Sequence, residues 1–299
     1  MHFESLDEFL NHSKSRVEPY LNTAIGKRRA SGVLSQAMAY SAVQGGKRVR
    51  AALVYGAARA CGVDDVAALD PLAAAVEAMH AYSLIHDDLP AMDDDALRRG
   101  QPSCHVAFDE ATAILAGDAL QALAFELLVK AHGPQISAEQ CLAMVACLAQ
   151  ASGAKGMVAG QMLDMAAAHD AVNLAQLERL HSLKTGALIV ASVEIGALSQ
   201  NHVSTKQIDF LRTYAQAIGL AFQVQDDILD IESDTATLGK AQGSDMINDK
   251  STYPALLGMT ASKARLMELH QQAKESVTEF GAAAQPLVWL ADFIVTRKH

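Results

Sequence analysis

Apolar side chains recur every three or four positions along most of the chain, which is the spacing of one face of an α-helix. Leu6, Phe9, Leu10 and Val17 mark a first amphipathic helix. The same spacing predicts further helices over residues 66–86, 111–130, 138–150, 174–183, 187–198 and 206–230. Several of these segments are apolar on more than one face, which is typical of a helix buried among others. No segment alternates apolar and polar residues for long enough to predict a strand.

Helix-breaking residues separate the predicted helices, at Gly45-Gly46, Gly62, Gly100-Gln101-Pro102 and Gly133-Pro134. A longer break is expected over residues 233–250, and residues 184–186 are expected to lie in a break between two helices. No linker or low-complexity stretch divides the 299 residues. The sequence therefore predicts an all-α fold with about ten to thirteen helices in a single domain over residues 1–299.

Composition supports a large helical core and argues against one class of partner. Hydrophobic residues make up 51% of the chain and only 7 residues are proline, so long helices can run uninterrupted. The net charge of -10 argues against nucleic acid as a partner, because binding to a phosphate backbone needs a basic face. An acidic protein that binds phosphate must recruit cations locally, from metal ions or from a few placed Lys and Arg side chains.

The cysteines and the N-terminal segment favour a cytoplasmic protein. Cys61, Cys104, Cys141 and Cys147 have no zinc-ligand spacing and are expected to be reduced thiols. The first ten residues, MHFESLDEFL, lack the basic-then-apolar layout of a signal peptide. No charge-free apolar run reaches about 18 residues, so we expect no stable membrane insertion.

Two aspartate-rich segments, residues 87–95 (DDLPAMDDD) and residues 226–230 (DDILD), each end a long apolar helix. Asp226 and Asp230 are four positions apart, so their carboxylates share one helix face and repel each other. The helix dipole also disfavours anions near a C-terminus. A solvated helix end is the alternative interpretation of one such segment, but two of them favour a hard divalent cation such as Mg²⁺, which prefers oxygen ligands.

Pro90 shapes the first of these segments. Proline has no N–H to donate to the carbonyl of His86, so the helix must kink or end there. That change of direction allows Asp93 to turn back toward Asp87. The first aspartate cluster can therefore converge on one point instead of extending along a straight helix.

Basic residues follow a pattern that suits a diphosphate. The segment GGKRVR (residues 45–50) opens a helix after two glycines, where exposed N–H groups favour anions, although the GxxxxGK[ST] frame of a P-loop is absent. Arg98-Arg99 follows the first aspartate cluster, and Lys240 and Lys250 follow the second. His80 lies two helical turns before Asp87, whereas His86 and His105 are more typical of structural histidines. Each cation alone is typical of a surface, but together they could bind diphosphate groups.

Seven motifs occur in a recognisable order: GGKRVR, HAYSLIHDDLPAMDDDALRRG, GQMLD, KTG, FQVQDDILD, LGK and DKSTYP. Over about residues 3–297 the chain resembles the trans-isoprenyl diphosphate synthases, and most closely the bacterial farnesyl diphosphate synthases. The resemblance implies the isoprenoid synthase fold, an all-α bundle around a central cavity, and a homodimer. It also implies a prenyltransferase that condenses isopentenyl diphosphate head to tail with dimethylallyl and geranyl diphosphate, in an Mg²⁺-dependent reaction that yields farnesyl diphosphate and diphosphate.

The resemblance also implies roles for individual residues. The implied metal ligands, for about three Mg²⁺ ions on the allylic diphosphate, are Asp87, Asp88, Asp93, Asp226, Asp227 and Asp230. The implied contacts to that diphosphate are Arg98, Lys184 and Lys240, and Lys250 is a further candidate substrate-binding residue. Thr185 and Gln223 are implied to place oxygens near the carbocation. The implied isopentenyl diphosphate pocket consists of Gly46, Lys47, Arg50, His80 and Arg99. Gln161, Asp164 and Asp245 are implied to support the residues that contact the substrate and the metal ions.

Two further features bear on specificity. Tyr82 lies five residues before Asp87, and with Ser83 it is expected to form the floor that stops the product at fifteen carbons. The basic C-terminus, Arg297-Lys298-His299, is expected to fold over the isopentenyl pocket when substrates are bound. The chain departs from the family pattern at Ala51, where proline is common, and at Ala96, which makes Asp95 a doubtful metal ligand.

Three alternatives remain open from the sequence. One is a geranyl or geranylgeranyl diphosphate synthase, with a shorter or longer product. Another is a terpene cyclase, although such enzymes need no isopentenyl pocket. The third is a catalytically silent partner subunit, which is expected to carry a broken aspartate motif, whereas both motifs here are intact.

Overall fold

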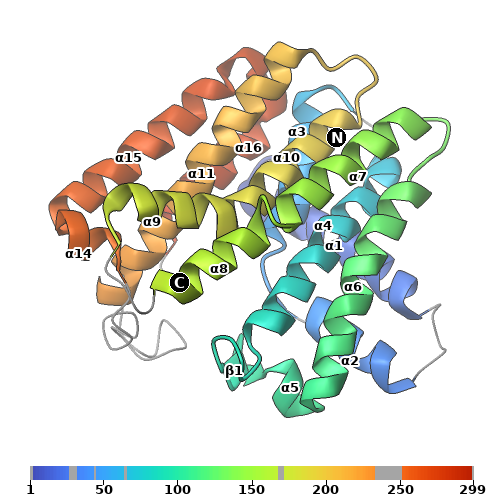
Figure 1. Ribbon diagram of the computed structural model, residues 1–299. Helices are drawn as coiled ribbons and strands as arrows, with labels where there is room; N and C mark the ends of the chain where they lie inside the picture. The colour runs from blue at the N-terminus through green and yellow to red at the C-terminus, as the bar shows by residue number, and fades with distance from the viewer. Residues whose placement is uncertain are drawn as a thin grey trace.

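A computed structural model of the chain describes residues 3–26, 32–43, 45–63, 66–167, 172–232 and 251–297. Nearly all of this part is helical, as Figure 1 shows, which confirms the predicted all-α fold. The helices are α1 (Leu6–Gly26), α2 (Gly32–Val43), α3 (Val49–Ala60), α4 (Val66–Asp87), α5 (Cys104–Ala107), α6 (Glu110–Lys130), α7 (Ala138–Ser152), α8 (Met157–Ala167), α9 (Leu174–His181), η1 (Ser182–Gly186), α10 (Ala187–Leu198), α11 (Thr205–Glu232), α14 (Tyr253–Leu257), α15 (Met259–Ser276), η2 (Thr278–Ala284) and α16 (Gln285–Thr296).

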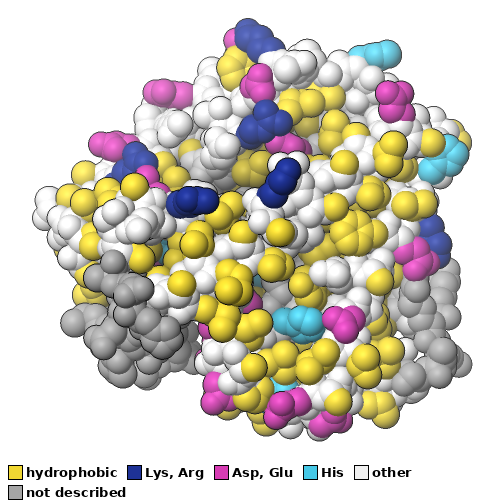
Figure 2. Space-filling model, in the orientation of Figure 1, with side chains coloured by type: hydrophobic (Ala, Val, Ile, Leu, Met, Phe, Trp, Pro, Cys, Tyr) yellow, Lys and Arg dark blue, Asp and Glu magenta, His cyan; other side chains and the backbone are white. Residues whose placement is uncertain are grey.

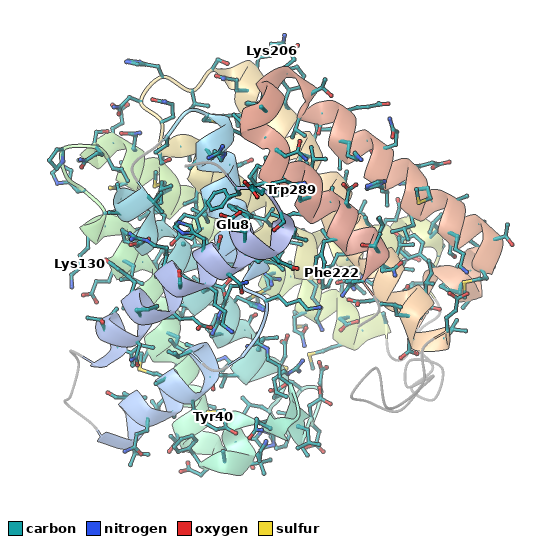
Figure 3. All side chains as sticks on the ribbon, turned by 180° about the vertical axis from the view of Figure 1, so that it is seen from behind. Glu8, Tyr40, Lys130, Lys206, Phe222 and Trp289 are labelled. Carbon is teal, nitrogen blue, oxygen red and sulfur yellow. The ribbon has the colours of Figure 1, made fainter. Side chains whose placement is uncertain are left out.

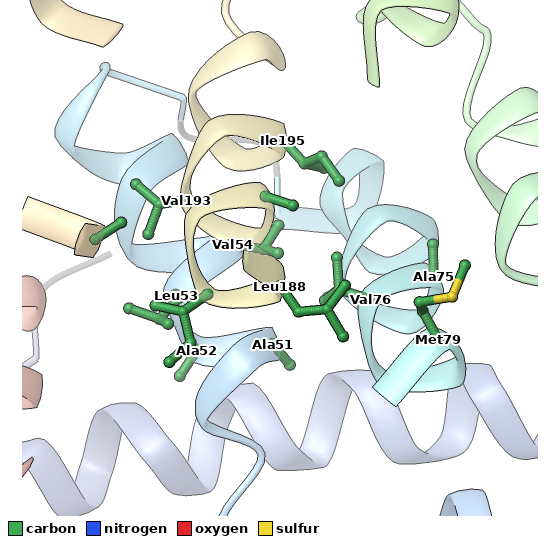
Figure 4. Packing of buried hydrophobic residues seen from close by; sticks show 14 of the residues in the cluster. Ala51, Ala52, Leu53, Val54, Ala75, Val76, Met79, Leu188, Val193 and Ile195 are labelled. Carbon is green, nitrogen blue, oxygen red and sulfur yellow. The ribbon is translucent and has the colours of Figure 1, made fainter. Parts of the chain in front are cut away.

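The centre of the fold is α10, which packs against α3, α4, α7 and α11. This helix carries apolar residues around its whole circumference, so it is stable only when surrounded by other helices. Figure 4 shows side chains of α10, such as Leu188 and Val193, among those of α3 and α4. Each fully buried aliphatic side chain of this kind contributes about 1.5–3 kcal/mol. The long helices that carry the aspartate clusters, α4 and α11, are therefore anchored to one apolar centre.

Local signals set where several helices begin. Ser137 accepts a hydrogen bond from the backbone N–H of Gln140, and the Gln140 side chain accepts one from the Ser137 N–H. Asn173 and Gln176 make the same reciprocal pair at the start of α9. These capping boxes satisfy N–H groups that the first helical turn leaves without partners.

Two elements differ from the sequence-based expectations. The predicted break at residues 184–186 is wrong, because α9, η1 and α10 continue one another through a π-helical turn. A short antiparallel pair, β1 (Leu97–Arg98) and β2 (Gln101–Pro102), also follows the first aspartate cluster. Both differences lie at the candidate site, where they position Lys184 and Arg98.

Two apolar helical stretches in the described part of the chain, Glu110–Lys130 and Ala138–Ala167, are long and apolar enough to span a membrane by length and composition. The expectation of no membrane insertion was based on charge-free runs, which is a stricter measure. Of the most apolar window in each stretch, 44% and 33% respectively is buried inside the protein. The remaining apolar side chains face outward and need another explanation. The four cysteines are free thiols.

Candidate active site

The first aspartate cluster folds back on itself, as the position of Pro90 in the sequence predicts. Helix α4 ends at Asp87, and the backbone N–H of Asp93 donates to the carbonyl of Asp87 over 2.9 Å. Asp94 takes a left-handed conformation with φ of 52° to complete this turn. Asp87 and Asp93 are thus brought next to each other.

Asp88 is engaged by Arg98. Its carboxylate is 2% exposed and accepts a hydrogen bond of 2.9 Å from the Arg98 Nε, with a second contact from Nη2. Arg98 also contacts Asp95 at 3.2 Å. The small strand pair holds Arg98 in this place, so the structure joins a predicted metal ligand to a predicted diphosphate contact.

Lys184 lies between the two aspartate clusters. Its Nζ donates to Asp164 over 2.6 Å and lies 3.9 Å from an Asp93 oxygen. Burial works against the charge of Lys184, but the surrounding carboxylates, chiefly Asp164, raise its pKa overall. The π-helical turn can approach α8 this closely because α8 has Gly160 there, where a Cβ would lie 2.5 Å from the Lys184 Cα.

The Asp87 carboxyl is held in an environment that disfavours its charge. Burial raises its pKa to about 6, Lys184 opposes this shift and Asp93 adds to it. A carboxylate in such a place gains stability from a nearby cation. This is the electrostatic property expected of a metal ligand before the metal binds.

The second aspartate cluster lies on the last turns of α11. Asp227 is 6% exposed and accepts a hydrogen bond of 2.8 Å from the Tyr253 backbone N–H. Asp230 is 2% exposed. A cavity of about 180 Å³ opens beside Asp227, and its lining also includes Lys184, Thr185 and Gln223. The predicted catalytic residues of η1 and α11 therefore share one cavity.

Arg297 lies against this second cluster. Its guanidinium donates to Asp226 over 2.7 Å and to the Phe222 carbonyl over 2.8 Å, and it stacks on the Phe222 ring at 3.8 Å. The Arg297 side chain is only 7% exposed. Lys47 lies 4.8 Å over the Phe293 ring, and burial followed by repulsion from Arg297 lowers the pKa of Lys47.

A second group of cations lies at the start of α3. Arg99 donates to the Gly45 carbonyl over 3.3 Å, and its guanidinium lies against Gly46. Burial lowers the pKa of Arg50 to about 10, opposed by Glu77 and aided by Arg99. Burial and the same cations, Arg50 first, hold the pKa of His80 well below its usual range. The structure thus brings together four of the five residues expected to form the isopentenyl pocket, Gly46, Arg50, His80 and Arg99.

Tyr82 and Ser83 lie one helical turn below Asp87. Tyr82 is 9% exposed and Ser83 is 7% exposed. The Ser83 hydroxyl donates to the His80 carbonyl of its own helix over 2.9 Å. Of these two side chains, Tyr82 is therefore the one large enough to form a floor.

Alanine at position 51, where proline is common in the family, allows one hydrogen bond that proline cannot make. The Ala51 N–H, which proline would lack, donates to Glu77 over 3.0 Å. Glu77 also pairs with Arg48 at 3.2 Å inside the protein. This buried pair fixes the chain just before the cationic pocket, and no sequence motif had indicated it.

Some predicted residues lie outside the described part of the chain: Lys240, Asp245, Lys250, Lys298 and His299. His181 was not predicted, although it lines the same cavity as Lys184 and stacks on Tyr253 at 6.0 Å. Its Nε2 is buried without a hydrogen-bond partner. Within the described residues, no three His, Cys, Asp or Glu side chains form a ready-made cage for a metal ion.

Comparison with known proteins shows the family to which the chain belongs. The polyprenyl synthetase family model matches residues 31–287. The chain is 49% identical to the farnesyl diphosphate synthase of Haemophilus influenzae over 295 residues, which cover 97% of this chain and 98% of that one. It is 52% identical to the farnesyl diphosphate synthase of Escherichia coli over 265 residues, 88% of each chain. The crystal structure of a geranyltransferase from Legionella pneumophila superposes with a TM-score of 0.86 at 40% identity, covering 97% of this chain and 96% of that one. With two aspartate clusters facing a shared lysine on an all-α fold, the chain belongs to the polyprenyl synthetase family and is a prenyltransferase.

Proposed function

We infer that the protein is a farnesyl diphosphate synthase, which joins isopentenyl diphosphate to dimethylallyl and then geranyl diphosphate. The observation that carries this function is the arrangement of charge. Lys184 lies between two aspartate clusters, and a separate group of Arg50, His80 and Arg99 surrounds the loop before α3. Two diphosphates therefore have two places to bind. The names of the bacterial relatives support the same function.

Mg²⁺ is the cation that fits the aspartate clusters, as about three ions with the allylic diphosphate. The proposed ligands are Asp87, Asp88, Asp93, Asp226, Asp227 and Asp230. The burial that, together with the nearby Asp93, raises the Asp87 pKa supports a cation there. Mg²⁺ usually takes one or two carboxylates and completes its shell with phosphate oxygens and water, so a preformed cage is not required. When bound, it neutralises the charge that develops on the leaving diphosphate.

The chain's own side chains orient the allylic substrate. We assign Lys184 and Arg98 to the allylic diphosphate, together with Lys240 and Lys250. Asp88 accepts hydrogen bonds from Arg98, and Asp227 accepts one from the Tyr253 N–H, so a metal ion that binds either carboxylate must displace that partner or share the carboxylate with it. Thr185 and Gln223 line the same cavity and present oxygens toward the developing carbocation. The departing diphosphate takes the proton that the product loses.

The second substrate belongs to the other group of cations. We assign isopentenyl diphosphate to Gly46, Lys47, Arg50, His80 and Arg99. Burial of Arg50 and His80 keeps water away from this pocket, which strengthens each charged contact. A neutral His80 can donate one hydrogen bond without adding charge.

Product length separates this function from its alternatives. We propose that Tyr82, with Ser83, is the floor below the metal ligands, so growth stops at fifteen carbons. A geranyl or geranylgeranyl synthase would need a higher or a lower floor. A terpene cyclase has no use for the Arg50 and His80 pocket. We further propose a single-domain, cytoplasmic enzyme that acts as a homodimer.

One incubation tests the function. The purified protein is supplied with isopentenyl and geranyl diphosphate with and without Mg²⁺, and the products are separated by chain length. We expect a fifteen-carbon diphosphate that forms only with Mg²⁺. A twenty-carbon main product would favour a geranylgeranyl synthase, a cyclic hydrocarbon would favour a cyclase, and no turnover would favour a silent subunit.

The metal role of Asp87 has its own test. Asp87→Asn should lower kcat by at least about 100-fold, because it removes a ligand that acts on the leaving group. The melting temperature should not fall, since Asn relieves the burial penalty that raises the Asp87 pKa. The control is Asp209→Asn on α11, where the side chain is 59% exposed. Near-normal turnover of folded Asp87→Asn would remove this residue from the metal site.

A further inference from the structure

Helices α4 and α6 pack against each other, and two residues from each helix concern us here. Tyr82 and His86 are one turn apart on α4, and Gly117 and Gln121 are one turn apart on α6. Residues four apart share a helix face, so each pair forms a short ridge. The Tyr82 and His86 rings meet edge to face, with centroids 4.9 Å apart and planes at 72°.

The His86 ring is fixed against α6. Its Nε2 lies 3.1 Å from the Ile114 carbonyl and 3.9 Å from an Asp118 oxygen. Gly117 makes room for the ring, because a Cβ there would lie 2.5 Å from His86 Cδ2 and closer still to Nε2. Real Cβ atoms do not approach other atoms this closely, so any side chain at this position would push the ring aside.

The Tyr82 ring is fixed from two sides. Its edge-to-face contact with His86 holds one side of the ring. The Gln121 side chain of α6 acts on the hydroxyl at the other end, where it opposes the rise in the Tyr82 pKa that burial causes. A tyrosine with both ends held cannot change rotamer without losing one of these contacts.

We propose that His86, Gly117 and Gln121 are positioning residues that hold the Tyr82 ring across the path of the growing isoprenoid chain. Product length then depends on these three residues, which we call the brace, as well as on the size of Tyr82. This proposal depends on the proposed function, in which Tyr82 is the floor. A floor that can swing aside admits a further isoprene unit, whereas a braced ring does not.

Two substitutions weaken the brace without altering the ring itself. Gln121→Met keeps the length of the side chain and removes the polar group that acts on the Tyr82 hydroxyl. Gly117→Ala displaces His86 from its place beside the ring. Matched controls are Gln271→Met, on the exposed face of α15, and Gly32→Ala, where a Cβ meets nothing within 4 Å. Tyr82→Ala tests the floor directly.

All variants receive dimethylallyl diphosphate and excess isopentenyl diphosphate with Mg²⁺, and the fifteen- and twenty-carbon products are quantified. We expect Gln121→Met and Gly117→Ala each to raise the twenty-carbon share roughly 5- to 10-fold, the effect of losing one contact of ordinary strength. For Gln121→Met the rate of the first condensation and the melting temperature should stay close to those of Gln271→Met, whereas Gly117→Ala should also lower the melting temperature, because its Cβ overpacks the contact with His86. A purely structural role would change the melting temperature and leave product length alone.

The outcomes separate the brace from the floor and from the function. If Tyr82→Ala lengthens the product while Gln121→Met and Gly117→Ala do not, the floor stands and the brace is overturned. If Tyr82→Ala also stops at fifteen carbons, the limit lies elsewhere and the brace has nothing to hold. If the unaltered protein makes no fifteen-carbon product, the proposed function fails first. Should Gly117→Ala not fold, Gln121→Met decides the matter alone.

Discussion

Arg297 places a positive charge where a metal ion is expected to bind. Its guanidinium contacts Asp226 at 2.7 Å, and Gln225 holds its carbonyl at 3.1 Å. A cation that reaches Asp226 must displace this guanidinium or share the carboxylate with it. The C-terminal segment is expected to cover the isopentenyl pocket when substrates are bound, and Arg297, its described residue, pairs with a candidate metal ligand.

Replacing Arg297 by glutamine should therefore have two opposite effects. The metal-free protein should lose stability, because Asp226 loses its partner, while Mg²⁺ should bind about tenfold more tightly in the presence of an unreactive allylic diphosphate analogue. Melting curves over a range of Mg²⁺ concentrations measure both. The control is Lys206→Gln, which removes the same charge near the start of α11, far along the helix from Phe222 (Figure 3). An unchanged Mg²⁺ dependence in Arg297→Gln would contradict this role.

His181 makes the stability of the protein depend on pH. Burial lowers its pKa to about 4, with Asp164 opposing and Lys184 aiding the shift. The unfolded chain binds a proton below about pH 6.5 and the native state does not, so stability is complete above that pH and is lost as pH falls toward 4. Between pH 7 and 5 the loss should be about 1–2 kcal/mol.

Denaturant unfolding at several pH values checks this expectation. His181→Phe keeps a ring beside Tyr253 but cannot bind a proton, so its stability should fall less between pH 7 and 5. His202→Phe, at an exposed turn, is the comparison. If both variants keep the full acid-induced loss, burial of His181 is not its source.

At the level of elements, the π-helical turn depends on one close approach. Gly160 of α8 lies against the backbone of Lys184 in η1. Gly160→Ala should push η1 away, which misplaces the Lys184 ammonium from Asp164 and Asp93. A displacement of this kind costs up to about 100-fold in rate, and the overpacking costs about 1–3 kcal/mol of stability.

Steady-state kinetics and melting test the π-turn prediction together. Gly26→Ala, at an open position near the end of α1, is the matched control. A folded Gly160→Ala variant with ordinary kcat would mean that the contact only fills space.

The elements that could be predicted from sequence are those set by local rules. The long apolar segment over residues 66–86 matched α4, Val66–Asp87, because a helix that is apolar on most sides must be buried among others. The turn of Asp93 toward Asp87 followed from the missing N–H of Pro90. The π-helical turn and the Arg297–Asp226 pair could not be predicted, because each depends on a contact between positions far apart in the chain.

At the scale of the whole molecule, the exposed apolar side chains are unevenly spread. Figure 2 shows hydrophobic side chains gathered on the face formed by α6, α7 and α8. The exposed members in those helices are Ile114, Leu115, Val129, Leu142, Val158, Met162, Leu163 and Met165. A patch of this size on a water-exposed face is typical of an interface, and the same side chains account for the two membrane-like helices.

The expected occupant is a second copy of this chain, because a homodimer is what the family resemblance implies and an apolar patch on each copy can cover its equal. Leu142 is 69% exposed and Leu115 is 57% exposed.

Leu115→Glu with Leu142→Glu would bury unpaired charges in that interface, at a cost of at least about 2 kcal/mol each. Light scattering after gel filtration should give twice the 31.7 kDa chain mass for the unaltered protein and a single chain mass for the variant. Met267→Glu, on α15 and 54% exposed, adds the same charge outside the patch and should leave the dimer intact. A dimer that survives both Leu115→Glu and Leu142→Glu would place the interface on another face, and an unaltered protein of single mass would leave the patch without a second copy to cover it.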